Sequence, residues 1–169
     1  MWNNEILQNT VRFIVLVLVQ VLLLDKILFL GYINPYLYPL FIIIYPLTGN
    51  KGLLILLSFL LGLSIDMFSD SGGIHAAASV FIAWIRPFVL KYSFGVSYEY
   101  NTMRVHSASL SQQMAYVLSM VFVHHFVLFS LEIFNMSHIL FILKNTLFSG
   151  VFSTIVIFCT LYLFAKRTT

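Results

Sequence analysis

Residues 53–90 read LLILLSFLLGLSIDMFSDSGGIHAAASVFIAWIRPFVL. Two apolar runs, at about 53–68 and 74–90, flank a short polar break that holds Asp70, Gly72 and Gly73. Each run approaches the roughly 20 residues that a helix needs to cross a lipid bilayer. Glycine and aspartate end helices and form turns. The stretch therefore predicts two antiparallel transmembrane helices joined by a tight turn.

Small residues mark the faces on which these two helices meet. Ser58, Gly62 and Asp66 are four residues apart, so they share one face of the first helix. Along one edge of the second helix lie four small residues: Gly72, Ala76, Ser79 and Ala83. Small side chains let two membrane helices approach closely. The spacing predicts a closely packed helical hairpin.

The acidic residues at this turn allow two interpretations. A carboxylate near a helix N-terminus is stabilised by the free backbone amides and by the helix dipole. Asp66 or Asp70 would then cap the second helix and fix the hairpin. Alternatively, Asp66 contacts a partner or a ligand. Both interpretations predict that Asp66→Leu is damaging, but only the second predicts loss of function without loss of protein from the membrane.

The composition extends the membrane assignment to the whole chain. Hydrophobic residues make up 60% of the 169 residues and charged residues 9%, whereas a soluble domain carries about 25% charged residues. We expect an all-α integral membrane protein, a six-transmembrane-helix bundle that forms a single domain. The expected spans are about 11–30, 36–47, 53–68, 74–90, 114–134 and 140–164.

The second of these runs is short for a membrane span. As a helix, residues 36–47 would extend about 18 Å, against a hydrocarbon core of about 30 Å. Pro39 is compatible with a first helical turn, and Pro46 is expected to end the helix. Whether this run crosses the membrane fully stays open at this point.

The positively charged residues indicate an orientation. With six spans, two cations fall on one side, Lys26 and Lys144. The opposite side holds seven: Arg12, Lys51, Arg86, Lys91, Arg104, Lys166 and Arg167. Because cytoplasmic loops are enriched in Lys and Arg, both termini are expected in the cytoplasm of a bacterial cell, with the chain in the inner membrane. We interpret these cations as residues of cytoplasmic loops that set the orientation in the membrane, so we expect no nucleic-acid partner.

The polar residues within the remaining spans suggest no enzyme. There is no phosphate-binding glycine loop, no cysteine pair and no zinc-protease pattern. His124 and His125 are interpreted as neutral side chains that form hydrogen bonds between helices, with a proton relay or a metal site with Glu132 as the alternatives. Arg86 is interpreted as an anchor at the membrane interface. We expect no catalytic residue, no cofactor and no metal.

The hairpin also carries a resemblance to a known family. The pattern from Gly62 to Asp66, the serine/glycine turn at 69–73 and the small-residue helix that starts GIHAAA resemble the rod-shape-determining protein family MreD. Asn34-Pro35 and Lys51-Gly52 also occupy positions typical of that family. The specific part covers about residues 34–90, and the rest agrees in hydropathy. The Asp70-Ser71-Gly72 insertion in the turn departs from the pattern.

The resemblance implies a non-enzymatic member of the machinery that elongates the lateral cell wall. Proteins of this family associate with the single-span protein MreC, and through it with MreB filaments, RodA and a class B transpeptidase. The expected partner-binding or structural residues are Gly62, Asp66, Ser69, Asp70, Gly73, Ala76 and Ala83. The small residues of the second helix would admit a partner helix, and the rim around Asp66 and Asp70 would meet periplasmic partners.

Two other function classes remain as alternatives. MreD-like folds are similar to the substrate-capturing membrane subunit of energy-coupling-factor vitamin transporters, which binds a small ligand in an outward-facing pocket. The first span, about 11–24, is rich in valine and leucine and lacks the Ala-x-x-x-Ala face expected for docking on a coupling subunit. An intramembrane enzyme built on His124 and His125 would need a convergent set of groups that the sequence does not display.

Overall fold

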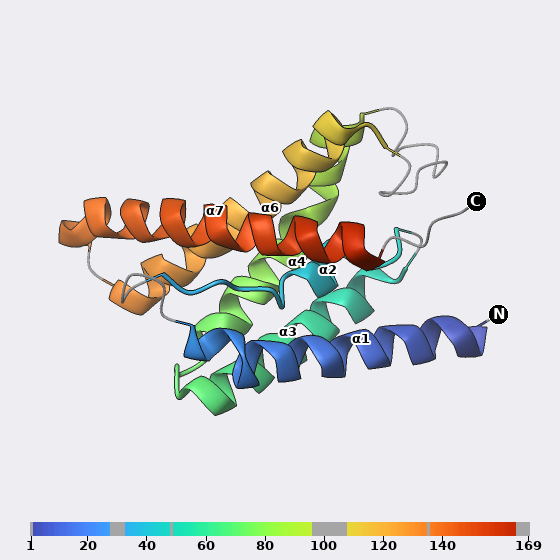
Figure 1. Cartoon of the computed structure of the whole chain (residues 1–169), viewed down its shortest axis with the longest axis horizontal. Helices are drawn as coiled ribbons and strands as arrows, with labels where there is room; N and C mark the ends of the chain where they lie inside the picture. Colours follow the sequence, from blue (N-terminus) through green and yellow to red (C-terminus); the bar gives the residue numbers. More distant parts are fainter. Residues whose placement is uncertain (1, 28–32, 48, 96–107, 135, 165–169) are drawn as a thin grey trace.

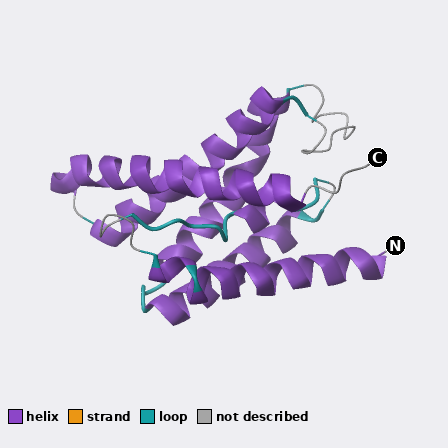
Figure 2. Cartoon of the chain, viewed as in Figure 1, coloured by secondary structure: helices purple, strands orange, loops and turns teal. Residues whose placement is uncertain are grey.

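The computed structural model describes residues 2–27, 33–47, 49–95, 108–134 and 136–164, and within these ranges the fold is helical (Figures 1 and 2). The described residues include five helices long and apolar enough to cross a membrane. These are α1 (Trp2–Leu22), α3 (Lys51–Ser69), α4 (Ile74–Phe94), α6 (Leu110–Ile133) and α7 (Ile139–Phe164). The expected all-α fold with several helices of membrane-spanning length is confirmed for the described residues.

The long helices run back and forth between two ends of the molecule (Figure 1). Helix α3 packs on α4, α4 on α6 and α6 on α7, while α1 packs beside α3. The first turn of α1 and the last turn of α7 lie at the same end. The opposite end holds the short helix η1 (Leu24–Lys26), the turn between α3 and α4, and the connection between α6 and α7 through η3 (Met136–His138).

The expected continuous helix at 36–47 is wrong. Residues 33–39 are not helical, and the only helical part is α2 (Leu40–Ile44), which begins after Pro39 and ends before Pro46. The segment lies in the middle of the bundle, where Tyr38 and Ile42 are fully buried. Non-helical backbone is tolerated in a membrane protein only where protein or water, and not lipid, surrounds it.

Polar side chains from the flanking helices bind the backbone of this segment. Gln20 of α1 is fully buried, donates to the Pro35 carbonyl at 3.1 Å and accepts from the Leu37 amide at 2.8 Å. Ser153 of α7 accepts from the Tyr36 amide at 2.8 Å. Because unpaired backbone groups in the bilayer cost several kcal/mol each, these bonds are what permits an extended path here.

Arg86 is not the interfacial anchor that its place in the sequence suggested. It is buried inside the bundle, where its guanidinium donates to the Tyr45 carbonyl and, through Nε at 3.0 Å, to the Tyr116 hydroxyl. The Tyr116 hydroxyl in turn donates to the Ile43 carbonyl at 3.1 Å. These carbonyls belong to the C-terminal end of α2, where a cation also complements the helix dipole. Arg86 thus fixes α2 against α4 and α6.

Candidate functional site

The backbones of α3 and α4 are in close contact at Gly62. A Cβ atom at Gly62 would overlap the backbone of His75 and Ala76, which are the second and third residues of α4. No side chain can move aside to relieve such an overlap, because the obstacle is main chain. The predicted close packing of the hairpin is therefore confirmed, and it depends on a glycine at this position.

One turn after Gly62, Asp66 caps α4 from the neighbouring helix. Its two carboxylate oxygens accept from the Ala76 amide at 2.8 Å and from the His75 amide at 3.0 Å. The N-cap residue of α4 is Gly73, which has no side chain to supply this bond. Asp66 therefore takes the role that a serine or aspartate N-cap normally plays. The capping interpretation is confirmed for Asp66.

Two further side chains complete the environment of this carboxylate. Ser71 Oγ donates to Asp66 Oδ1 at 2.5 Å, and His75 Nδ1 lies 3.0 Å from the same oxygen. Asp66 is 5% exposed. A buried carboxylate with four donors has little capacity left for another ligand. Asp66 is thus accounted for by contacts within the chain.

Asp70, the other candidate cap, ends α3 instead of starting α4. Its backbone lies in the left-handed region at φ +52°, and its amide donates to the Asp66 carbonyl. Gly73 continues the turn at φ +96°. The Asp70 side chain is exposed. Nearby, Ser69 Oγ donates to Asp25 Oδ2 of η1 at 3.2 Å, which ties the end of α3 to the end of α1.

The small-residue face of α4 is not a free docking surface. Ala76, Ser79 and Ala83 are each buried inside the bundle, with exposed fractions of 4% or less. Ala76 itself packs against Gly62 of α3. The expectation that this face admits a partner helix is wrong, because this chain's own helices already cover it. The small residues serve the internal packing of the hairpin.

The two histidines of α6 form hydrogen bonds to other elements, as expected. His124 Nε2 lies 2.7 Å from the Tyr38 hydroxyl of the extended segment, and His125 Nε2 lies 3.0 Å from Ser153 Oγ of α7. Among the described residues, no group of three or more His, Cys, Asp and Glu side chains could hold a metal ion. The histidines therefore contribute to the polar contacts that hold residues 33–39 in place.

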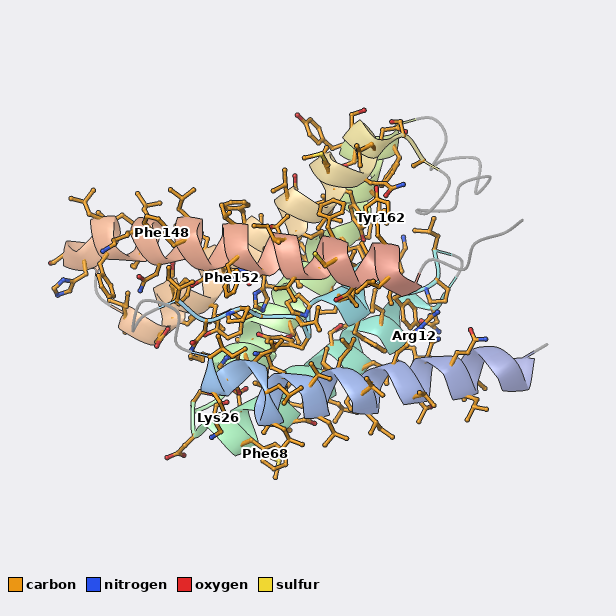
Figure 3. The ribbon with its side chains drawn as sticks, in the orientation of Figure 1. Arg12, Lys26, Phe68, Phe148, Phe152 and Tyr162 are labelled. Carbon is orange, nitrogen blue, oxygen red and sulfur yellow. The ribbon has the colours of Figure 1, made fainter. Side chains whose placement is uncertain are left out.

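A polar cavity lies at the end of the molecule opposite the first turn of α1. Its volume is about 420 Å³, and six of its lining residues are Asp25, Lys26, Asn34, Tyr36, His75 and Glu132. Figure 3 labels Lys26 and Phe68 at this end of the bundle, and both line the cavity. A second cavity of about 230 Å³ shares Asn34, Tyr36 and Glu132 with the first and reaches Asn145 of α7.

Several polar groups of these walls lack partners within the described part of the chain. Asn34 Oδ1 and Asn145 Oδ1 are buried and accept no hydrogen bond. No hydrogen bond or ion pair joins the side chain of Glu132 or of Lys26 to another described residue. No sequence motif marks this site. The polar residues named above come from η1, the segment 33–39, α4, α6 and α7, and only the fold brings them together.

Comparison with known protein families, with curated proteins and with solved structures finds no match to this chain.

Proposed function

We propose that this chain is a non-enzymatic membrane scaffold of the bacterial cell-wall elongation machinery, an MreD-like protein that helps to maintain rod shape. The observation that carries the proposal is the α3–α4 hairpin. The residues on which the resemblance rests have structural roles: Gly62 sets the helix contact, Asp66 caps α4, and Gly73 forms the turn. Because these three residues all stabilise the same hairpin, the resemblance supports a shared fold more strongly than a similar hydropathy would.

The proposal includes six membrane crossings. At about 3.3 Å per extended residue for 33–37 and about 1.5 Å per residue for the turn at 38–39 and α2, the segment reaches roughly 27 Å, slightly less than the hydrocarbon thickness of about 30 Å. The segment would then cross between α1 and α3. Six crossings place both termini on one side, and the excess of Lys and Arg assigns that side to the cytoplasm of the inner membrane.

The mechanism in this proposal is binding and orientation, with no chemical step. Because the inner small-residue face is covered, an MreC-like single-span helix would pack on an outer face of the bundle. RodA and a class B transpeptidase would then join through that partner. The outer faces of α3, α4 and α7 present large apolar side chains to the membrane, among them Leu56, Trp84 and Leu147. Lipid covers the faces that no partner occupies.

Co-purification from native membranes tests the proposal. The full chain is cross-linked in its own membranes, purified and analysed by mass spectrometry. We expect an MreC-like protein together with the cell-wall synthases. Recovery of a coupling subunit with paired ATPases would overturn the scaffold proposal and support the vitamin-transporter alternative.

Site-specific cross-linking then locates the partner. A photo-reactive amino acid is placed separately at Leu56 of α3, Trp84 of α4 and Leu147 of α7, which are all exposed. We expect one of these positions to cross-link strongly to the MreC-like helix and the others to react mainly with lipid. Ala83 is the matched control, because its side chain is buried and should give no cross-link to a partner.

A further inference from the structure

We infer that the polar cavity and the smaller cavity beside it form one binding site for a small amino acid that carries two ammonium groups and one carboxylate, such as a diamino acid. The site lies at the end of the bundle near η1 and the α3–α4 turn, away from the covered small-residue face. The inference goes beyond the scaffold function and does not depend on it. It rests on three observations about the walls: their charges, their unpartnered amides and their shared residues.

The cavities are continuous in their lining. Asn34, Tyr36 and Glu132 belong to both, so a molecule in the larger space touches groups that also face the smaller one. The individual volumes are about 420 and 230 Å³. Small-molecule sites commonly enclose roughly 300–1,000 Å³. The space is suited to a compact solute of amino-acid size.

The charges of the lining complement such a solute. Asp25 and Glu132 supply two carboxylates, and Lys26 supplies one ammonium. Asp25 is held in place by Gln20 Nε2 at 2.7 Å and by Ser69 Oγ, which are both neutral donors, so its negative charge is not compensated by them. Two negative groups and one positive group match a ligand with two ammonium groups and one carboxylate.

The position of Glu132 strengthens this assignment. Glu132 lies in the last turn of α6, which ends at Ile133. The C-terminus of a helix carries partial negative charge, so a carboxylate there is unfavourable and a cation is favourable. An ammonium group bound beside Glu132 would compensate both the carboxylate and the helix end.

Two buried amide oxygens point to a ligand that donates hydrogen bonds. Asn145 is 8% exposed, lines the smaller cavity, and its Oδ1 accepts no bond within the described residues. Asn34 lines both cavities, and its Oδ1 is likewise buried without a hydrogen-bond donor among the described residues. A buried acceptor without a donor costs about 1–3 kcal/mol. Ammonium groups offer three donors each and no acceptor, so they suit these two oxygens.

Binding of L-lysine to the purified full-length protein tests the inference. Radiolabelled L-lysine is measured by equilibrium dialysis, with putrescine and Nα,Nε-diacetyl-lysine as competitors. We expect saturable binding of lysine, weaker competition by putrescine, which lacks the carboxylate, and none by diacetyl-lysine, which lacks the ammonium groups. Absence of saturable lysine binding up to about 10 mM would overturn the inference, as would equal competition by diacetyl-lysine.

Variants of the exposed charged groups identify the site. Glu132→Gln should weaken lysine binding at least roughly tenfold, because the acceptor of the ammonium group loses its negative charge. Lys26→Gln should weaken the binding of lysine but leave that of putrescine unchanged. Asp70→Asn is the matched control, because Asp70 is an exposed carboxylate at the same end that lines neither cavity. Unchanged lysine binding in Glu132→Gln would place any lysine site elsewhere and contradict the inference.

Discussion

The Asp66 carboxylate and the side chains on the far wall of the polar cavity lie at the same end of the molecule, but they differ in how many hydrogen bonds they form. Asp66 is bonded within its own chain by Ser71, by His75 and by the Ala76 amide. On the far wall, Asn145 Oδ1 has no donor, and the Glu132 side chain forms no hydrogen bond or ion pair within the described residues. The hydrogen-bonding capacity of Asp66 is therefore used within the chain, whereas Glu132 and Asn145 can still bind a ligand.

This difference distinguishes residues that stabilise the fold from residues that can bind a ligand, although the two kinds look alike in the sequence. Asp66 and Glu132 are both acidic residues near the ends of long apolar helices. An unpartnered buried amide such as that of Asn145 destabilises a protein, and the exposed carboxylate of Glu132 beside the same cavity is free to bind a cation. The comparison assigns Asp66 to folding and Glu132 to recognition, and the following substitutions test that division.

Replacing Asp66 should have the largest effect. Asp66→Leu leaves the amides of His75 and Ala76 without their acceptor, and we expect a loss of about 4 kcal/mol in the free energy of unfolding. Unfolding in mixed micelles, titrated with a denaturing detergent, measures it. Asp70→Asn is the control and should change stability by less than about 0.5 kcal/mol. A stable Asp66→Leu protein that has lost only its partner would show that Asp66 is a contact residue.

Gly62→Ala should have the next largest effect. Alanine favours a helix over glycine by about 1 kcal/mol, but its Cβ would overlap the α4 backbone, so we expect a net loss of about 3 kcal/mol. Gly150→Ala of α7 is the matched control. Its Cβ would lie 3.2 Å from the ring of Phe122, a side chain that is able to shift. Equal effects of the two substitutions on the unfolding midpoint would contradict the close helix contact.

Asn145→Leu should leave stability nearly unchanged or raise it by about 1 kcal/mol. The substitution removes an unpartnered buried amide and replaces it with an apolar side chain of similar size. Lysine binding should fall in the same variant. Gln20→Leu provides the contrast, because Gln20 binds the backbone at Pro35 and Leu37 and its loss should cost about 3 kcal/mol. If Asn145→Leu proved as damaging as Gln20→Leu, the cavity wall would be structural.

The smallest effect is expected at Asp70. The residue is held at φ +52°, a conformation that glycine adopts without strain. Asp70→Gly should therefore raise the free energy of unfolding by about 0.5 kcal/mol and leave lysine binding unchanged. A clear loss of stability would reveal a side-chain role for Asp70 in the turn.

Much of the hairpin could be predicted from the sequence, because its signals are local. The apolar runs of membrane length, the four-residue spacing from Gly62 to Asp66 and the glycine turn all lie within residues 53–90. The sequence could not predict which of Asp66 and Asp70 caps α4. Both lie close to the N-terminus of α4, and only the backbone of the turn determines which carboxylate reaches the amides.

The wrong predictions for Arg86 and for the segment 36–47 have the same physical cause. The interpretations of Arg86 and of the segment 36–47 rest on local signals, namely hydropathy, the length of the run and the positions of the prolines. In the structure, Arg86 binds carbonyls at the end of α2, and Gln20 and Ser153 bind the extended backbone. These pairings join residues far apart in the sequence. No periodicity predicts them, and the cavity escaped prediction for the same reason.

The main claim is that Asp66 stabilises the fold whereas Glu132 and Asn145 bind a ligand. Hydrogen exchange tests it most directly, measured on the full-length protein in lipid nanodiscs with and without L-lysine. The account predicts that the amides of His75 and Ala76 exchange slowly in both conditions and become fast in Asp66→Leu. It also predicts that lysine slows exchange around Glu132 and Asn145 but not at Gly62, which lines neither cavity. Fast exchange at His75 and Ala76 in the unaltered protein, or no response to lysine near Glu132, would contradict it.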